Sequence, residues 1–145
     1  MNETLITLQG YVGSNVRLRA AGESEVATFR VGCTPRRWSR KEQTWSDAAT
    51  QWYSVSCWRG LAHHVERSLR RGDPVVVHGR LSTSVWVNSD GVEVTAYDVE
   101  ALFVGHDLNR GTTVFTKTPR PVAATEPVSA VPAEPAAEPP TSTAA

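Results

Sequence analysis

The sequence predicts an all-β domain, a five-stranded barrel with one short helix between the third and fourth strands, followed by a disordered C-terminal tail. Five segments rich in β-branched and apolar residues predict the strands. One stretch with helical spacing of its apolar residues separates the third strand from the fourth. Beyond residue 105 the chain is rich in Pro, Ala, Thr and Glu, and such a composition buries too little apolar surface to fold. We therefore expect a folded domain over residues 1–105 and a disordered Pro/Ala-rich tail over residues 106–145.

The first two strands are expected on either side of a polar turn at residues 21–24. Residues 4–12 are apolar and β-branched, with Gly10 as a bulge or bend, and residues 16–19 can continue this strand after a kink. Residues 25–33 alternate cleanly between apolar and polar side chains and form the second strand.

Residues 51–58 form the third strand and divide their side chains between two different faces. Because strand side chains alternate, Tyr53, Val55 and Cys57 point to one side, which we expect to be the core. The opposite side carries two indoles and two small hydroxyls, from Trp52, Ser54, Ser56 and Trp58. This combination suits a surface on which flat ligands such as nucleic-acid bases stack.

A similar division recurs in residues 81–87. The expected core face has three apolar residues and a threonine, namely Leu81, Thr83, Val85 and Val87. The opposite face has Ser82, Ser84 and Trp86. The alternative is that the indoles of both strands cover a hydrophobic edge or fill a subunit interface, since Trp is usually well buried.

The remaining elements are a helix and two strands. Leu61, Val65 and Leu69 form one apolar stripe of a helix over residues 60–71, which Gly72 ends. The fourth strand starts at Pro74, bends at Gly79 and continues through residues 82–87. An Asp-Gly turn at residues 88–91 connects it to the last strand, residues 92–104.

Residues 36–50 follow neither the strand nor the helix period, so we expect a long loop or the flexible tip of a hairpin. Residues 1–105 contain 12 Lys and Arg against 11 Asp and Glu, so any phosphate binding must come from local clusters. One such cluster lies in this segment, close to Trp38 and Trp45, and consists of Arg36, Arg37, Arg40 and Lys41. Basic groups interleaved with indoles favour nucleic-acid binding, the alternative being a solvated hairpin tip with an incidental aromatic. A second basic cluster closes the predicted helix.

Several other classes of protein are disfavoured. No window has the 18 continuous apolar residues of a membrane span, and no secretory signal opens the chain, so we expect a soluble cytoplasmic protein. Cys33 and Cys57 lack the spacing of a zinc site, and we expect free thiols and no metal or cofactor, with a disulfide as the alternative. An enzyme with Cys57 as nucleophile and His63 or His64 as base is disfavoured, because Cys57 is expected in the core.

Five short strands with one helix between the third and fourth is the arrangement of the OB-fold, whose face and hairpins bind oligonucleotides or oligosaccharides. Four runs of this chain resemble the bacterial single-stranded-DNA-binding protein family, namely residues 28–31, 51–55, 58–62 and 70–81. The resemblance covers about residues 3 to 105 and depends more on the spacing of these runs than on any single motif.

The resemblance implies a homotetramer that wraps single-stranded DNA and stacks its bases on four aromatic positions per chain. Motif matching places these positions at Trp38 or its close neighbourhood, Trp52, Trp58 and Trp86. The basic residues that the family uses in its second hairpin are matched by Arg36, Arg37, Arg40 and Lys41. Three further residues in the matched runs are expected to line the site, Ser54, Arg59 and Arg80.

The C-terminus departs from the family pattern. Family members normally end in a short acidic tip closing on an apolar pair, which recruits replication and repair proteins, whereas this chain ends in Thr-Ser-Thr-Ala-Ala. The chain thus resembles a paralogue that lacks this tip, and recruitment of repair proteins through it is not expected. The expected function is sequence-tolerant binding of single-stranded DNA during replication, recombination, repair or chromosome segregation in the cytoplasm, associated with the nucleoid. The alternative is an OB-fold module that binds RNA or a protein partner.

Overall fold

A computed structural model describes residues 2–120 of the chain. The chain divides into a first unit that runs to Thr113 and a second unit from Val114 onward. Residues 114–120 are exposed and have no regular secondary structure. The expected disorder of residues 121–145, and the ending that lacks an acidic tip, lie outside the described residues.

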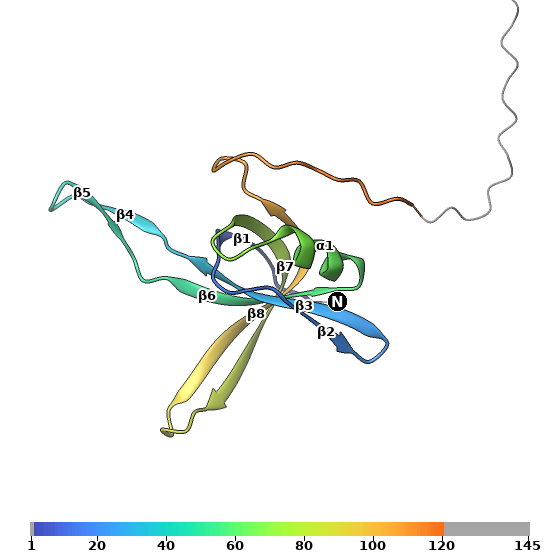
Figure 1. The fold of residues 1–145 in the computed structure, drawn as a ribbon. Coiled ribbons are helices and arrows are strands. Elements are labelled where there is room, and N and C mark those ends of the chain that lie inside the picture. The colour runs from blue at the N-terminus through green and yellow to red at the C-terminus, as the bar shows by residue number, and fades with distance from the viewer. Residues whose placement is uncertain (1, 121–145) are drawn as a thin grey trace, which may run out of the picture. The chain divides into compact units, whose positions relative to one another are not determined.

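The described part of the first unit contains eight strands and one helix (Figure 1). In chain order they are β1 (Leu5–Val12), β2 (Arg17–Ala21), β3 (Ser24–Cys33), β4 (Arg36–Ser39), β5 (Thr44–Asp47), β6 (Gln51–Trp58), α1 (Gly60–Ser68), β7 (Pro74–Val87) and β8 (Glu93–His106).

Six of the strands form one sheet in the order β1-β7-β8-β6-β3-β2, and β1 also pairs with β3. This additional pairing, at Tyr11–Gly32 and Val12–Val31, joins the two sides of the sheet, so that β1, β3, β6, β7 and β8 form a closed ring. The helix α1 follows β6 and precedes β7. The predicted fold class, five principal strands with one helix between the third and fourth, is confirmed.

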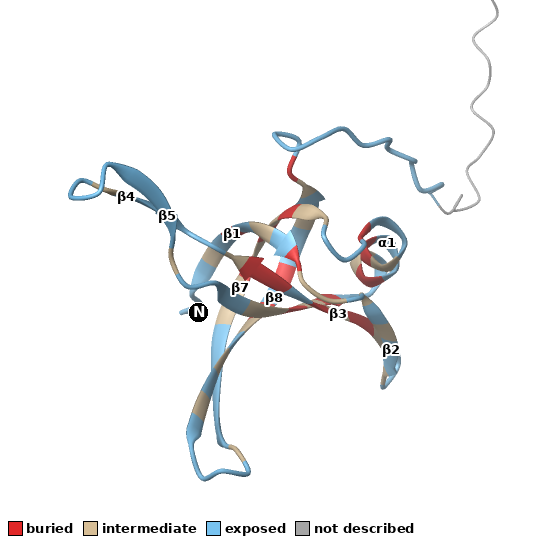
Figure 2. Ribbon diagram, turned by 60° about the vertical axis from the view of Figure 1, so that its left-hand side comes forward, coloured by how far each residue is buried: buried red, intermediate tan, exposed pale blue. Residues whose placement is uncertain are grey.

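The core lies inside this ring and includes buried residues of β3, β6 and β7; Figure 2 colours the buried parts of the ribbon red. Val31, Val55 and Val77 are fully buried there. The bend predicted at Gly79 is a β-bulge between His78 and Gly79. A Cβ at Gly79 would lie 2.8 Å from the carbonyl carbon of Glu100, so only glycine allows β7 and β8 to approach this closely at the bend.

The helix ends one turn earlier than predicted, at Ser68 instead of residue 71. Leu69 leaves the helix with an extended backbone, because its side chain packs into the core and only 3% of it is exposed. The next residue caps the end: the Arg70 guanidinium donates to the carbonyls of Glu66 and Leu69, while the Arg70 N–H donates to the Asp73 carboxylate. The predicted apolar stripe of the helix is therefore confirmed, whereas its end depends on the burial of Leu69 and on these capping bonds.

Residues 36–50 form a defined hairpin in place of a long loop. β4 and β5 pair as a separate two-stranded sheet that extends away from the ring (Figure 1, left). Its strands have four residues each, too few for alternation to be recognised in the sequence. The expectation of a hairpin tip is thus nearer to the structure than that of a loop.

The predicted core role of Val85 and Val87 is wrong, since 56% and 65% of these residues are exposed. β7 and β8 continue beyond the ring as a long hairpin (Figure 1, bottom). β6 pairs with β8 only from Tyr97 to Glu100, so no strand of the main sheet flanks the distal part of the hairpin. Alternation correctly separated the two faces of this segment, but nothing in residues 2–120 covers either face of its distal part.

The folded unit continues past residue 105, so the expected boundary falls inside β8. Only 6% of Asp107 is exposed, and its carboxylate accepts hydrogen bonds from the Gln9 side chain at 2.8 Å and from the Asn109 backbone at 3.0 Å. These bonds, the Gln9 bond first, lower the pKa of Asp107. The Asp107 N–H also donates to the Pro74 carbonyl.

Both cysteines are free in the structure. Cys57 is fully buried, and burial raises the pKa of its thiol to about 12. Burial also raises the pKa of the half-buried Cys33. Among residues 2–120, no helix has the length and apolar character needed to cross a membrane.

Candidate nucleic-acid interface

The predicted faces of β6 are confirmed by the structure. Val55 and Cys57 have no exposed surface, whereas 43% of Trp52 and 41% of Trp58 are exposed. The two indoles lie six residues apart on one outer face, with the half-buried Ser54 and Ser56 between them. This face therefore presents two separate flat surfaces with small polar side chains between them.

Two glycines and an arginine position the indole of Trp52. A Cβ at Gly32, the residue directly across on β3, would lie 3.1 Å from the indole, and a Cβ at Gly13 would overlap it. The Arg30 guanidinium lies over the ring, 4.7 Å from its centroid. Trp52 thus lies close to two glycines, with a cation over its ring.

Trp58 ends the same strand beside a buried valine. Val26 lies directly across from Trp58 on β3, and only 2% of it is exposed although it points to the outer face. The next residue, Arg59, has a φ of 60°, which is rare for a non-glycine residue, and its N–H donates to the Glu25 carbonyl at 3.0 Å. This bond fixes the chain as it leaves the strand, and the Arg59 side chain is exposed.

Trp86 belongs to the same outer face, although it lies on the projecting hairpin. Ser54 of β6 is level with Asp98 of β8, which pairs with Ser82 of β7. Trp86 lies four residues beyond Ser82 and therefore points to the same side. About half of it is exposed.

The β4–β5 hairpin carries a second aromatic group. Trp38 and Trp45 are cross-strand partners, with ring centroids 5.6 Å apart and planes tilted by 59°. Arg36 lies over Trp45 and forms an ion pair with Asp47 at 3.2 Å. The other predicted cations, Arg37, Arg40 and Lys41, are exposed, and no carboxylate in residues 2–120 pairs with them.

Trp45 was not selected from the sequence as a site residue. Its position next to the basic cluster was visible, but only the pairing of β4 with β5 places it against Trp38. With Trp45 included, all five tryptophans of the chain are between 41 and 59% exposed. This is unusual for a side chain that is mostly buried in folded proteins.

Three arginines that sequence reasoning missed lie on the same outer face. Arg30 is level with Ser54, Arg17 pairs with Thr28, and Arg19 pairs with Val26, the neighbour of Trp58. The alternating Arg17-Leu18-Arg19 was a usable signal, because Leu18 packs against the core and its neighbours must point outward. Their relation to the tryptophans depends on strand pairing and could not be read from the sequence.

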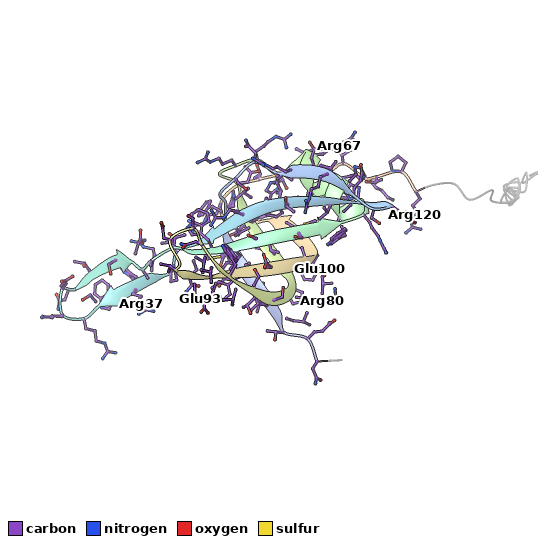
Figure 3. All side chains as sticks on the ribbon, turned by 90° about the horizontal axis from the view of Figure 1, so that it is seen from below. Arg37, Arg67, Arg80, Glu93, Glu100 and Arg120 are labelled. Carbon is purple, nitrogen blue, oxygen red and sulfur yellow. The ribbon has the colours of Figure 1, made fainter. Side chains whose placement is uncertain are left out.

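Arg80 lies in a more acidic part of this face. Its guanidinium bonds to Glu3 at 3.0 Å and to Glu100 at 3.4 Å, and the Glu3 hydrogen bond is the main cause of its raised pKa. Figure 3 shows Arg80 and Glu100 together, with Arg37 out on the hairpin. Arg80 was predicted to line the DNA-binding site, but two carboxylates already hold its guanidinium.

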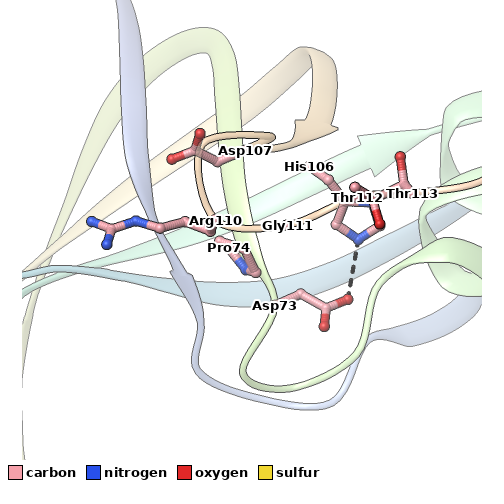
Figure 4. Close-up of a pocket in the computed structure, with 8 residues that line it drawn as sticks. All are labelled: Asp73, Pro74, His106, Asp107, Arg110, Gly111, Thr112 and Thr113. Carbon is pink, nitrogen blue, oxygen red and sulfur yellow. Dashed lines mark hydrogen bonds and ion pairs between the residues drawn. The ribbon is translucent and has the colours of Figure 1, made fainter.

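A small polar hollow of about 310 Å³ lies at the end of β8 (Figure 4). His106 and Asp73 pair across it at 3.2 Å, and the Asp107 carboxylate already has partners. None of its lining residues belongs to the aromatic face. Within the part of the chain that the structure describes, no three His, Cys, Asp or Glu side chains gather to hold a metal ion.

Comparison with protein families matches residues 2–107 to the single-strand binding protein family. The chain is 39% identical over 127 residues to single-stranded DNA-binding protein 1 of Streptomyces coelicolor, covering 88% of this chain and 81% of that one. It is 40% identical over 117 residues to single-stranded DNA-binding protein 2 of Streptomyces avermitilis, covering 81% and 73% of the two chains.

Solved structures show the same similarity. The small single-stranded DNA-binding protein of Streptomyces coelicolor superposes with a TM-score of 0.70 at 38% identity, covering 77% of this chain and all of that one. The second single-stranded DNA-binding protein of Mycobacterium smegmatis gives a TM-score of 0.61 at 31% identity, covering 80% of this chain and all of that one.

Proposed function

Because this chain belongs to the single-strand binding protein family, we propose that it binds single-stranded DNA with little sequence preference. The observation that supports this most directly is the exposure of all five tryptophans, three on one sheet face and two on the β4–β5 hairpin. Each base has a flat π-face, so indoles accept any sequence.

In this proposal the exposed side chains fall into two roles. The indoles stack on bases, and they are Trp38, Trp45, Trp52, Trp58 and Trp86. The cations contact phosphates, which carry no sequence information. From the sequence these are Arg36, Arg37, Arg40, Lys41, Arg59 and Arg80. Arg80 is the weakest candidate, because Glu3 and Glu100 compete with phosphate for its guanidinium. Ser54 lies between the indoles and offers a hydroxyl to a sugar or phosphate.

We propose that the protein is a binder without catalytic activity. It protects single strands exposed during DNA replication, recombination, repair or chromosome segregation, and it acts in the bacterial cytoplasm on nucleoid DNA. An enzymatic hypothesis would require Cys57 as the nucleophile. Cys57 is fully buried, and burial raises the pKa of its thiol. A protonated thiol without exposed surface is a poor nucleophile.

We also propose that the chain assembles as a homotetramer. β1 pairs with β3 only at Tyr11 and Val12, which leaves the rest of that edge open to a second chain. The outer side of β1 and β8 also exposes large apolar residues, among them Leu5, Tyr11 and Phe103. Light scattering at micromolar concentration is expected to give the mass of four chains, and a stable monomer contradicts this proposal.

Tryptophan fluorescence tests the proposed function directly. A poly-pyrimidine DNA single strand is expected to quench the emission strongly, because its bases stack on exposed indoles. A duplex of the same length serves as the control and should quench weakly. An RNA single strand in competition tests the alternative ligand: preferential binding of RNA contradicts the proposal, as does equal quenching by single strand and duplex.

A further inference from the structure

Cations and carboxylates occupy opposite flanks of the strand that carries Trp52 and Trp58. On the β3 side of β6, the outer face has Arg30 on β3 and Arg17 and Arg19 on β2. All three side chains are exposed, and no carboxylate in residues 2–120 forms an ion pair with any of them. This flank is therefore positively charged.

The opposite flank of β6 is acidic. β8 runs parallel to β6, and its Asp98 and Glu100 are level with Ser54 and Ser56 on the same outer face. Asp98 accepts a hydrogen bond from Ser84 at 2.9 Å, and no cation in the described chain pairs with it. Glu100 forms an ion pair with Arg80, which also holds Glu3, so this group of three has a net negative charge.

Resting on the proposed function, we propose that the sugar-phosphate backbone of a bound single strand runs along β2 and β3, over Arg17, Arg19 and Arg30. Its bases then point across β3 toward β6 and stack on Trp58 and Trp52. Asp98 and Glu100 repel phosphates and so keep the backbone from the β8 side.

The spacing of the strands fits this placement. Arg19, Val26 and Trp58 form one row across three strands, so Arg19 and Trp58 are separated by two inter-strand distances, or about 10 Å. A nucleotide whose base stacks on Trp58 therefore places its phosphate near Arg19. Arg17 lies two residues along β2, roughly 7 Å away, to meet the next phosphate of an extended strand.

The same path continues onto the β4–β5 hairpin. β3 and β6 lead directly into β4 and β5 at the end where Trp52 lies, and this hairpin carries the unpaired Arg37, Arg40 and Lys41. The β7–β8 hairpin with Trp86 leaves the ring in a different direction (Figure 1). The segment of DNA that follows the cations therefore runs from Trp58 past Trp52 to the β4–β5 hairpin without crossing the acidic β8 flank, and a different segment of the bound strand stacks on Trp86.

Two double variants with equal loss of charge test the path. Arg17→Gln with Arg19→Gln removes the cations beside the tryptophan face, and Arg67→Gln with Arg71→Gln removes two exposed cations outside the sheet. Affinity for a poly-pyrimidine DNA strand is measured at several salt concentrations. Log K falls as log salt rises, and each phosphate contact contributes about 0.7 to the magnitude of this slope. The first variant is expected to reduce the magnitude of the slope by about 1.4, and the second is expected to leave it unchanged.

Equal changes in slope for the two double variants would overturn the path, because the effect would then reflect net charge alone. If the first variant has a lower Tm, Arg19→Gln alone is used, with an expected loss of about 0.7 in slope. Asp98→Asn is expected to change affinity by less than about twofold, since screening weakens its effect on a backbone across the sheet. A large gain with Asp98→Asn and no effect of Arg19→Gln would place the backbone over β8. Failure of the wild-type protein to bind the strand refutes the proposed function itself. If the wild type binds and the variant with Arg17→Gln and Arg19→Gln has the same slope, only the path is refuted.

Discussion

The indole of Trp52 lies against Gly13, a residue 39 positions earlier in the chain, so that a methyl group at Gly13 would lie within 2.9 Å of Cη2. Gly13→Ala is therefore expected to turn the Trp52 ring away from its position and weaken binding of single-stranded DNA. The loss should stay below the full value of a stacked base, which is about 1 to 3 kcal/mol by alanine substitution in single-strand binding proteins.

The matched control for this change is Gly105→Ala, because a Cβ there meets no atom within 4 Å. We expect its affinity to equal that of the wild type. The measurements are fluorescence titration with a poly-pyrimidine strand and Tm on the same preparation. Unchanged affinity in a folded Gly13→Ala protein would show that the position of Trp52 does not matter for binding.

Trp58→Ala separates a binding surface from a core residue. Since 41% of Trp58 is exposed, we expect a loss of about 1 to 3 kcal/mol in binding free energy. Phe29→Ala, on the core face of the neighbouring strand, should instead cost about 3 to 5 kcal/mol of unfolding free energy. Calorimetry and affinity on both variants check this, and Trp58→Phe should retain most of the binding. Marked unfolding of Trp58→Ala with normal affinity would contradict the stacking role.

Trp45→Ala tests the residue that the sequence did not single out. Trp45 is paired with Trp38 at 5.6 Å, so we expect the substitution to lower affinity at least as much as Trp38→Ala. Loss of the aromatic pair should leave the Tm of the main sheet nearly unchanged, because β4 and β5 form a separate sheet. Asp47→Asn serves as the hairpin control: it breaks the exposed Arg36 ion pair, which contributes little stability, and should not weaken binding.

Truncation tests where the folded unit ends. A chain that stops at residue 113 should keep the Tm and the DNA affinity of the full chain, because it retains the Asp107 bonds to Gln9 and Asn109. A chain that stops at residue 105 should melt at a lower temperature, since it also loses the His106 pair with Asp73. Asp107→Ala in the full chain is expected to reproduce part of that loss. Equal Tm values for the two truncated chains would place the boundary at residue 105.

Alkaline pH should destabilise the protein through Cys57. Burial raises the pKa of its thiol from the usual 9.0 to about 12, so the folded state keeps a proton that the unfolded chain loses. The free energy of unfolding is therefore expected to fall as the pH rises from about 9 to about 12. Cys57→Ala should reduce this pH dependence, whatever its own stability, while Cys33→Ala should retain most of it. Denaturant unfolding at several pH values measures both, and identical slopes for Cys57→Ala and wild type contradict the prediction.

Local patterns in the sequence were enough to identify both faces of β6 and the order of the five principal strands and the helix, but not β2, β4 and β5 as separate strands. Side chains of a strand alternate because of its own backbone geometry, so the buried Val55 and Cys57 and the exposed Trp52 and Trp58 follow from residues 51–58 alone. The same reasoning failed for Val85 and Val87. Alternation says which side chains share a face, but coverage of that face depends on what packs against it.

The sequence by itself determined the fold class, the family, and three of the indoles on the sheet face, since these follow from local periodicity and the spacing of motifs. Only the tertiary structure decided which charges accompany those indoles. Arg19 lies in one row with Trp58 because of the register between β2 and β3 and the register between β3 and β6. The charge of Arg80 is neutralised by Glu3, which lies 77 residues away in the sequence. Such neighbours are set by sheet pairing between distant segments, and a periodic pattern carries no information about which strand lies beside it or in what register.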